Sequence, residues 1–445
     1  MSVIFKRKLY NRMLAWKNER KGSTALLVKG ARRVGKSTLV EQFAKEQYRS
    51  YILVDFAHAP KNVTDLFEDM YDLDFFFMQL QIRYGITLHQ RESVIIFDEV
   101  QLQPLARQAI KYLVKDGRYD YIETGSLLTI KKNVQNIVIP SEETRLTLFP
   151  LDYEEFRWAM EDDMSCSFIR MNLEKVHPLG DVAHRKLMRD FRLYLLVGGM
   201  PQSVNAYIES KNLSKVDTVK REILELYEDD FRKIDKSGNI SLLFDSIPAQ
   251  LSKNATRYVA SSVIERTTKM KMSEYISELS ESMTVNIAYH ANDPSVGLSL
   301  HKDPERYKLF VADTGLFVTL AFKDKDFTEN IIYEKMLSDK LSADLGYIYE
   351  NAIAQMLKTS GNELFYYTFK RETSNHPYEI DFLISKKNKI CPIEVKSSGY
   401  KSHVSLDAFC EKYPDRIFDR YLLYTKDVNK EQALKCLPVY MTPFL

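Results

Sequence analysis

Gly30-Ala31-Arg32-Arg33-Val34-Gly35-Lys36-Ser37 matches the phosphate-binding pattern G-x-x-x-x-G-K-[ST] at every fixed position. The apolar run at 25–28 before it predicts a buried strand, and residues 38–45 after it have helical spacing. A strand, a glycine loop and a helix start together form a cradle for an anion, because backbone N–H groups and the helix N-terminus point at phosphate oxygens. The alternative, a chance glycine turn with a surface lysine, is disfavoured by this context.

Each part of the loop has an expected role. Gly30 and Gly35 allow backbone dihedrals that are closed to other residues. Lys36 is expected to reach the β and γ phosphates as a catalytic residue, and Ser37 to place its hydroxyl on a magnesium ion. The residues expected to contact the nucleotide are Gly30, Ala31, Arg32, Arg33, Val34, Gly35, Lys36, Ser37 and Thr38.

A second motif lies 62 residues after Lys36, where the apolar run 94–97 ends in Asp98 and Glu99. This is a Walker-B arrangement, in which Asp98 holds the magnesium ion through water and Glu99 polarises the water that attacks the γ phosphate. The acidic pair favours ATP hydrolysis over the chemistry of a GTPase or kinase. The competing interpretation is a solvated acidic pair at the end of a strand.

The chain of 445 residues is longer than one hydrophobic core usually serves. It has 45% hydrophobic and 28% charged residues, as expected for a globular protein, and its net charge of +2 gives no global basic field for nucleic acid. The four cysteines show no zinc-site spacing, and no apolar run approaches a membrane span. We therefore expect reduced thiols, no membrane partner and a cytoplasmic location.

Strand-like runs at 24–29, 51–56, 93–97 and 119–123 alternate with helical stretches, which predicts a multidomain α/β protein that begins with a parallel sheet. Helical signals dominate after 151. A second helix-rich part runs from about 220 to 320, where three helices and a short hairpin suit a winged-helix module. A third α/β unit follows. The expected division is an N-terminal helix (1–22), a P-loop ATPase core (23–150), a helical lid (151–220), a winged-helix-like domain (221–335) and a restriction-endonuclease-like domain (336–445).

The C-terminal strands carry a second set of chemical groups. Asp381 lies on a predicted strand, and Glu394-Val395-Lys396 begins thirteen residues later, which is the D-x(n)-E-x-K pattern of restriction-type nucleases. Strand alternation puts Glu394 and Lys396 on one face. Asp381 and Glu394 are expected to bind a divalent metal, with Glu350 as a third acid, while Lys396 orients the attacking water. The competing interpretation is a salt-bridged Glu-Lys pair with an unrelated aspartate, in a domain that keeps the strands without the chemistry.

Several motifs together resemble one known group, the prokaryotic AAA-type ATPases with a C-terminal domain of unknown function. The resemblance covers nearly the whole chain. It implies an additional-strand ATPase core, a helical and winged-helix middle, and a restriction-endonuclease-like C-terminal domain. The motifs are Lys29 to Ser37, Phe97-Asp98-Glu99-Val100-Gln101, Thr124-Gly125-Ser126, Phe149-Pro150-Leu151, Glu154-Glu155-Phe156 and Gly198-Gly199-Met200-Pro201.

In additional-strand ATPases the strand that ends at Thr124 and Ser126 lies between the P-loop and Walker-B strands, so either hydroxyl is a candidate sensor of the γ phosphate. A plain strand-to-loop turn is the alternative. Arg145 is a candidate arginine finger, in cis or across a homo-oligomer, although Thr144 stands where the group usually has glycine. Gly198 to Pro201 is a clear helix terminator with no known chemical role.

Two functions remain open at this level. One is a magnesium-dependent ATPase coupled to DNA binding or to metal-dependent cleavage of nucleic acid. The other is a nucleotide-dependent switch that gates a protein partner, with an inactive nuclease-like module. The intact set of Asp381, Glu394 and Lys396 favours the first, because a pure interaction module has no need to keep it.

Overall fold

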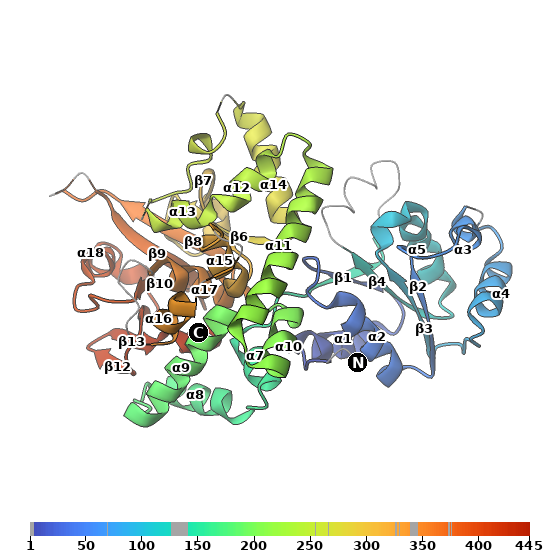
Figure 1. Ribbon diagram of the computed structural model, residues 1–445, viewed down its shortest axis with the longest axis horizontal. Coiled ribbons are helices and arrows are strands. Elements are labelled where there is room, and N and C mark those ends of the chain that lie inside the picture. The colour runs from blue at the N-terminus through green and yellow to red at the C-terminus, as the bar shows by residue number, and fades with distance from the viewer. Residues whose placement is uncertain are drawn as a thin grey trace. The chain divides into compact units, whose positions relative to one another are not determined.

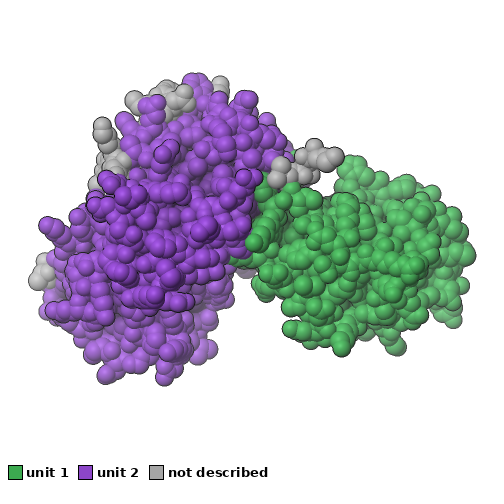
Figure 2. Space-filling model, turned by 90° about the horizontal axis from the view of Figure 1, so that it is seen from below, with its two compact units in different colours: residues 1–149, 281–283 green, residues 150–280, 284–445 purple. Residues whose placement is uncertain are grey.

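The computed structural model divides the chain into two compact units, coloured separately in Figure 2. Unit 1 comprises Met1–Phe149 with Glu281–Met283, and unit 2 comprises Pro150–Ser280 with Thr284–Leu445. The break after Phe149 lies close to the boundary expected at 150. The structure describes residues 4–68, 70–125, 141–253, 255–265, 267–324, 327–328, 330–338, 346–372, 374 and 376–445.

Unit 1 is built on a five-stranded sheet of order β2-β3-β4-β1-β5, in which every neighbouring pair is parallel (Figure 1). This confirms the predicted parallel α/β sheet, and it confirms that β4 lies between β1 and β3. The edge strand β5 was not predicted as a strand. The strands are β1 (Ala25–Lys29), β2 (Ser50–Asp55), β3 (Ser93–Asp98), β4 (Asp120–Gly125) and β5 (Glu143–Thr147).

Strand alternation gives this sheet two apolar faces, each covered by helices. On β3, for example, Val94 and Ile96 join the core beneath α1 and α2, whereas Ile95 and Phe97 join the core beneath α4 and α5. The sheet is therefore the middle layer of three. The helical segments are α1 (Lys8–Arg20), α2 (Lys36–Gln47), α3 (Lys61–Thr64), η1 (Asp65–Phe67), α4 (Leu73–Tyr84), η2 (Val100–Leu102) and α5 (Pro104–Asp116).

Unit 2 contains a mixed eight-stranded sheet of order β12-β13-β11-β10-β9-β8-β6-β7. The antiparallel hairpin of β6 and β7, which the sequence analysis put in a winged-helix-like domain, joins β8 of the expected nuclease-like domain through a parallel pairing. Residues from both expected domains thus share one sheet. The strands are β6 (Val285–Ala291), β7 (Lys302–Val311), β8 (Leu364–Phe369), β9 (Tyr378–Lys386), β10 (Lys389–Lys396), β11 (Arg420–Tyr424), β12 (Asn429–Glu431) and β13 (Leu434–Pro438).

Two helices matter most for this sheet. α17 packs against β6, β7, β8 and β10, and α18 buries its apolar residues in the core formed with β8 and β9.

None of the helices in the described ranges combines the length and apolar character needed to span a bilayer. The α-helices after residue 150 are α7 (Tyr153–Ala159), α8 (Met164–Lys175), α9 (Asp181–Val197), α10 (Pro201–Ser210), α11 (Leu213–Ile234), α12 (Asn239–Asp245), α13 (Ile247–Ser252), α14 (Lys269–Ser282), α15 (Thr314–Ala321), α16 (Asn330–Leu337), α17 (Gly346–Thr359) and α18 (Val404–Lys412).

The Gly198-Gly199 pair allows a very close approach of chain segments within unit 2. A Cβ atom on Gly198 would lie 2.3 Å from Asp313 Oδ1, and one on Gly199 would lie 2.0 Å from the carbonyl oxygen of Leu151. Asp313 accepts hydrogen bonds from the backbone N–H groups of Gly199 (2.6 Å) and Leu316 (2.9 Å), so it caps α15 and fixes the end of α9 at the same time. The motif that lacked a chemical role therefore has a packing role.

Gly199→Ala is expected to destabilise the protein by about 2 kcal/mol, because overpacking a site closed by backbone atoms forces the backbone to move. Urea unfolding measures the change. Gly238→Ala is the matched control: Gly238 has φ 78° and no atom within 4 Å of an added Cβ, so only the strain of a positive φ is expected there. Equal stability of the Gly199 variant and the wild type would contradict the packing role.

Candidate nucleotide site and C-terminal acidic pocket

The glycine loop in unit 1 has the shape that its sequence predicts. Gly35 adopts φ 94° immediately before the first residue of α2, a backbone angle that side-chain-bearing residues avoid. Gly30 lies so close to the chain that a Cβ would come within 2.4 Å of the carbonyl oxygen of Leu148. The Lys36 ammonium folds back over the loop and donates to the carbonyl oxygens of Gly30 (3.1 Å) and Ala31 (3.0 Å).

Lys36 lies in an environment prepared for an anionic ligand. Its side chain is buried, and burial lowers the pKa of its ammonium, while Glu99 and Asp98 act in the opposite direction. A buried cation whose hydrogen bonds in the described structure go to neutral carbonyl oxygens is incompletely compensated. Phosphate oxygens would supply the missing negative charge.

Asp98, at the end of β3, joins the loop to the neighbouring strands. Its Oδ1 atom accepts from the Ser37 hydroxyl (2.9 Å) and from the Thr124 hydroxyl at the end of β4, and the Glu99 N–H donates to that same Thr124 oxygen (3.3 Å). Parallel strands bring their carboxyl ends to one edge of the sheet, which is why these side chains meet. A hydroxyl and a carboxylate oxygen side by side are ligands that suit Mg²⁺, so Ser37 and Asp98 fit the ion that the sequence implies.

Glu99 leaves the strand with a left-handed backbone, φ 52°, so the chain turns at the residue expected to polarise water. The side-chain amide of Gln101 donates to Glu99 Oε2 and orients the carboxylate. Gln101 belongs to the motif Phe97 to Gln101, but no role was predicted for it. Its position two residues after the expected catalytic base could have indicated a role in orienting that base.

Arg145, the candidate finger, pairs with Glu143 on its own strand, and about half of its side chain is exposed. Glu143 is also held by the buried Arg107 of α5 (2.8 Å), which reaches Glu123 of β4 as well (3.2 Å). Burial raises the pKa of Glu123 to about 8. In this arrangement the Arg145 guanidinium is engaged within its own chain, and its role as a finger stays a prediction. The other sensor candidate, Ser126, lies outside the described residues.

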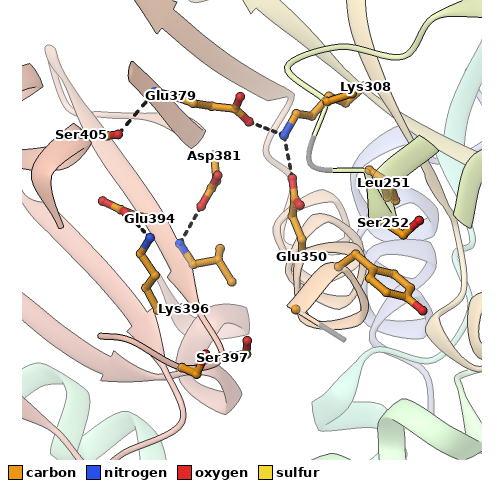
Figure 3. Close-up of a pocket in the computed structure, with 15 residues that line it drawn as sticks. Leu251, Ser252, Lys308, Glu350, Glu379, Asp381, Glu394, Lys396, Ser397 and Ser405 are labelled. Atoms are coloured by element: carbon orange, nitrogen blue, oxygen red, sulfur yellow. Dashed lines mark hydrogen bonds and ion pairs between the residues drawn. The ribbon is translucent and has the colours of Figure 1, made fainter. Parts of the chain in front are cut away.

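Unit 2 contains a polar pocket of about 490 Å³ whose lining includes all four residues of the predicted nuclease set (Figure 3). α17 supplies Glu350, β9 supplies Asp381, and β10 supplies Glu394 and Lys396. Strand alternation puts Glu379 on the same face of β9 as Asp381. The predicted residues thus meet in space although they are spread over nearly fifty positions of sequence.

The strand residues of the pocket are held by short contacts. Asp381 Oδ2 accepts from the backbone N–H of Val395 (2.8 Å), and Lys396 pairs with Glu394 Oε1 (2.8 Å). Burial raises the pKa of Asp381 well above its ordinary value, and Glu350 adds to the effect. Burial lowers the pKa of Lys396, but the bond to Glu394 outweighs this and leaves the pKa raised. The positive charge of Lys396 is therefore retained at neutral pH.

Two charged residues of this pocket, Lys308 on β7 and Glu379 on β9, were not predicted from the sequence. The Lys308 ammonium pairs with Glu350 Oε1 (2.9 Å) and with Glu379, as the dashed lines in Figure 3 show. Burial lowers the pKa of Lys308, but Glu350, Glu379 and Asp381 outweigh burial and raise it well above its ordinary value. The sequence did contain a sign of this arrangement. Lys308 lies within the apolar run at 307–311, and a charge in such a run needs partners of opposite charge.

Within the described part of the chain, no group of three or more histidine, cysteine, aspartate or glutamate side chains is arranged to hold a metal ion. Glu350, expected as a third metal ligand, is instead paired with Lys308. Metal binding by Asp381 and Glu394 stays a prediction.

Comparison with known families identifies the first part of the chain. Residues 22–157 match the family model described as an AAA domain. Residues 188–326 and 345–441 match two further models, each described as a domain of unknown function (DUF8612 and DUF4143). The family match and the geometry around Gly30 to Ser37 define this part as an AAA-type ATPase domain. No curated protein matches the chain.

Similar solved structures are distant. PCH-2 of Caenorhabditis elegans is 11% identical with a TM-score of 0.28, over 48% of this chain and 65% of PCH-2, so the chain spans less than two thirds of that protein. The RuvB Holliday junction branch migration motor of Thermotoga maritima is 15% identical (TM-score 0.27; 63% of this chain and 89% of RuvB). Cdc6p of Pyrobaculum aerophilum is 11% identical (TM-score 0.25; 77% and 97%). Similarity at this level carries no argument about function.

Proposed function

We propose that unit 1 hydrolyses ATP with Mg²⁺ held at Ser37 and Asp98. The observation that carries this proposal is the convergence on Asp98 of hydroxyls from the P-loop helix and from β4. Lys36 binds and orients the β and γ phosphates, and Glu99 takes the proton of the attacking water. When bound, Mg²⁺ neutralises charge on the phosphate oxygens. Thr124 positions Asp98 and Glu99 by contacting both.

Asp98→Asn tests this proposal. The amide removes the negative charge from the expected Mg²⁺ site, so phosphate release from ATP at limiting Mg²⁺ is expected to fall by at least about tenfold, with recovery at higher Mg²⁺. Asp55→Asn is the matched control, because Asp55 ends the adjacent strand opposite Asp98 but pairs with the exposed His58. Equal Mg²⁺ dependence in both variants would remove Asp98 from the metal site.

A second proposal concerns unit 2, where the pocket groups Asp381 with the Glu394–Lys396 pair. We propose that this pocket cleaves nucleic acid with a divalent metal, and that nucleotide state in unit 1 controls DNA binding or cleavage. The alternative is that ATP binding gates a protein partner and that the nuclease-like fold only supplies an interaction surface. A homo-oligomer, with Arg145 acting across subunits, is compatible with either.

Cleavage assays on single- and double-stranded DNA and RNA, with and without ATP, separate these two proposals. A Mn²⁺-dependent nick is expected in the wild type and is expected to disappear in Asp381→Ala and in Glu394→Ala. Asp407→Ala, on α18, is the control outside the pocket. Cleavage that survives both pocket variants would place the activity elsewhere, and no cleavage by the wild type favours the switch.

A further inference from the structure

The acidic pocket of unit 2 contains two lysines, and they are held differently. The Lys308 side chain is only 6% exposed and its ammonium is shared by the carboxylates of Glu350 and Glu379. Lys396 is 33% exposed and pairs with one carboxylate, Glu394. Lys308 is thus a buried cation with two anionic partners, whereas Lys396 is more exposed to solvent and has one.

Charge balance shows what the pocket attracts. Its lining has four carboxylates, Glu350, Glu379, Asp381 and Glu394, against the two lysines, so carboxylates outnumber ammonium groups even with all three ion pairs intact. Glu394 is 5% exposed, and no hydrogen-bond partner is present for its Oε2 atom among the residues that the structure describes. Asp381 has one oxygen engaged by the backbone of β10. A hard cation is the ligand that carboxylate oxygens in such a setting favour.

We propose that the ammonium group of Lys308 is an internal cation of this pocket, which engages Glu350 and Glu379 and thereby keeps Glu350 from binding a divalent ion. A divalent ion that enters the wild-type pocket is left with Asp381 and Glu394. Lys308 comes from β7, in the segment that matches a different family model from the one that contains the strands of Asp381 and Glu394. This inference concerns metal binding alone and holds whether or not the pocket cleaves nucleic acid.

The electrostatic argument is one of competition. A divalent ion near Glu350 would lie close to a fixed positive charge, and like charges a few ångströms apart in a buried site repel strongly. Removing the Lys308 ammonium leaves Glu350 and Glu379 as partly buried, uncompensated carboxylates, which is costly unless another cation replaces it. Loss of Lys308 is therefore expected to create affinity for a divalent ion.

The test measures Mn²⁺ binding to the full-length protein without nucleotide, by electron paramagnetic resonance of the free ion. Lys308→Met is expected to bind Mn²⁺ at least about tenfold more tightly than the wild type. Glu350→Gln is expected not to weaken wild-type binding, and to abolish the gain in the Lys308→Met background. Asp381→Asn is expected to weaken binding in both backgrounds. Because the ATP site is the same in all of these proteins, differences among them report on the pocket.

Two results would overturn the proposal. One is unchanged Mn²⁺ affinity in a Lys308→Met protein that keeps the wild-type circular dichroism spectrum. The other is a loss of affinity in Glu350→Gln as large as that in Asp381→Asn, which would make Glu350 a metal ligand while Lys308 is present. If Lys308→Met does not fold, Lys308→Gln replaces it, because its amide still donates a hydrogen bond to the partly buried carboxylates of Glu350 and Glu379.

Discussion

Lys36→Ala is expected to raise the dissociation constant for ATP by at least about 100-fold, because two or more charge-assisted hydrogen bonds to phosphate are lost. The structure adds a reason specific to this chain. The Lys36 ammonium already lies inside the loop, on the carbonyl oxygens of Gly30 and Ala31, and needs only to turn toward an incoming phosphate. Equilibrium titration with a fluorescent ATP analogue measures the change.

The control for that variant is Lys45→Ala on the same helix, where the lysine is exposed and pairs with Glu41. It removes one positive charge at a distance from the loop, so any effect of net charge alone appears in both variants. A thermal melt of each protein checks that the loop variant is folded. ATP affinity that is as high in Lys36→Ala as in Lys45→Ala would contradict the P-loop assignment.

Glu99→Gln is expected to bind ATP with wild-type affinity and to hydrolyse it about 100-fold to 10,000-fold more slowly. The amide has the shape of the carboxylate but cannot take a proton from water. Thr124 contacts the backbone N–H of residue 99, and this contact does not depend on the side chain, so the position of the turn is retained. Single-turnover phosphate release, measured beside ATP affinity, separates binding from chemistry.

A matched variant for that experiment is Glu92→Gln, because Glu92 is exposed and its only ion pair in the described structure is with Arg49 on the surface. Its turnover is expected to equal that of the wild type. If Glu99→Gln turns over as fast as Glu92→Gln, the base is another group. Gln101, which holds Glu99, would then be a structural contact rather than part of the catalytic arrangement.

The ATPase half was largely predictable from the sequence, because its signals are local. The loop motif, the acidic strand end and the period of the apolar runs each lie within a few residues. The strand order that the resemblance implies puts the strand of Thr124 between those of the P-loop and Asp98, as observed, whereas the contact between Thr124 and Asp98 was not predicted. The edge strand β5 was missed because residues 143–147 contain two charged and two hydroxyl side chains. Its formation depends on pairing with β1, which local propensity does not reveal.

The pocket in unit 2 was predicted in part. Asp381, Glu394 and Lys396 follow a pattern within 16 residues, whereas Lys308 contacts Glu379 across 71 positions of sequence. That contact exists because the β6–β7 hairpin extends the sheet and α17 packs across it, and neither arrangement is encoded by spacing. Glu350 was therefore predicted from the sequence to bind a metal, because its pairing with Lys308 could not be predicted from the sequence.

The parallel pairing of β6 with β8 has a practical consequence for anyone who wants to produce unit 2 in pieces. The backbone of 288–290 hydrogen-bonds to the backbone of 364–366, so a recombinant fragment starting near 345, where the last family match begins, would present β8 as a bare strand edge. Such an edge invites self-association of the fragment. A fragment intended to stay monomeric should start upstream of Val285 and keep the hairpin that carries Lys308.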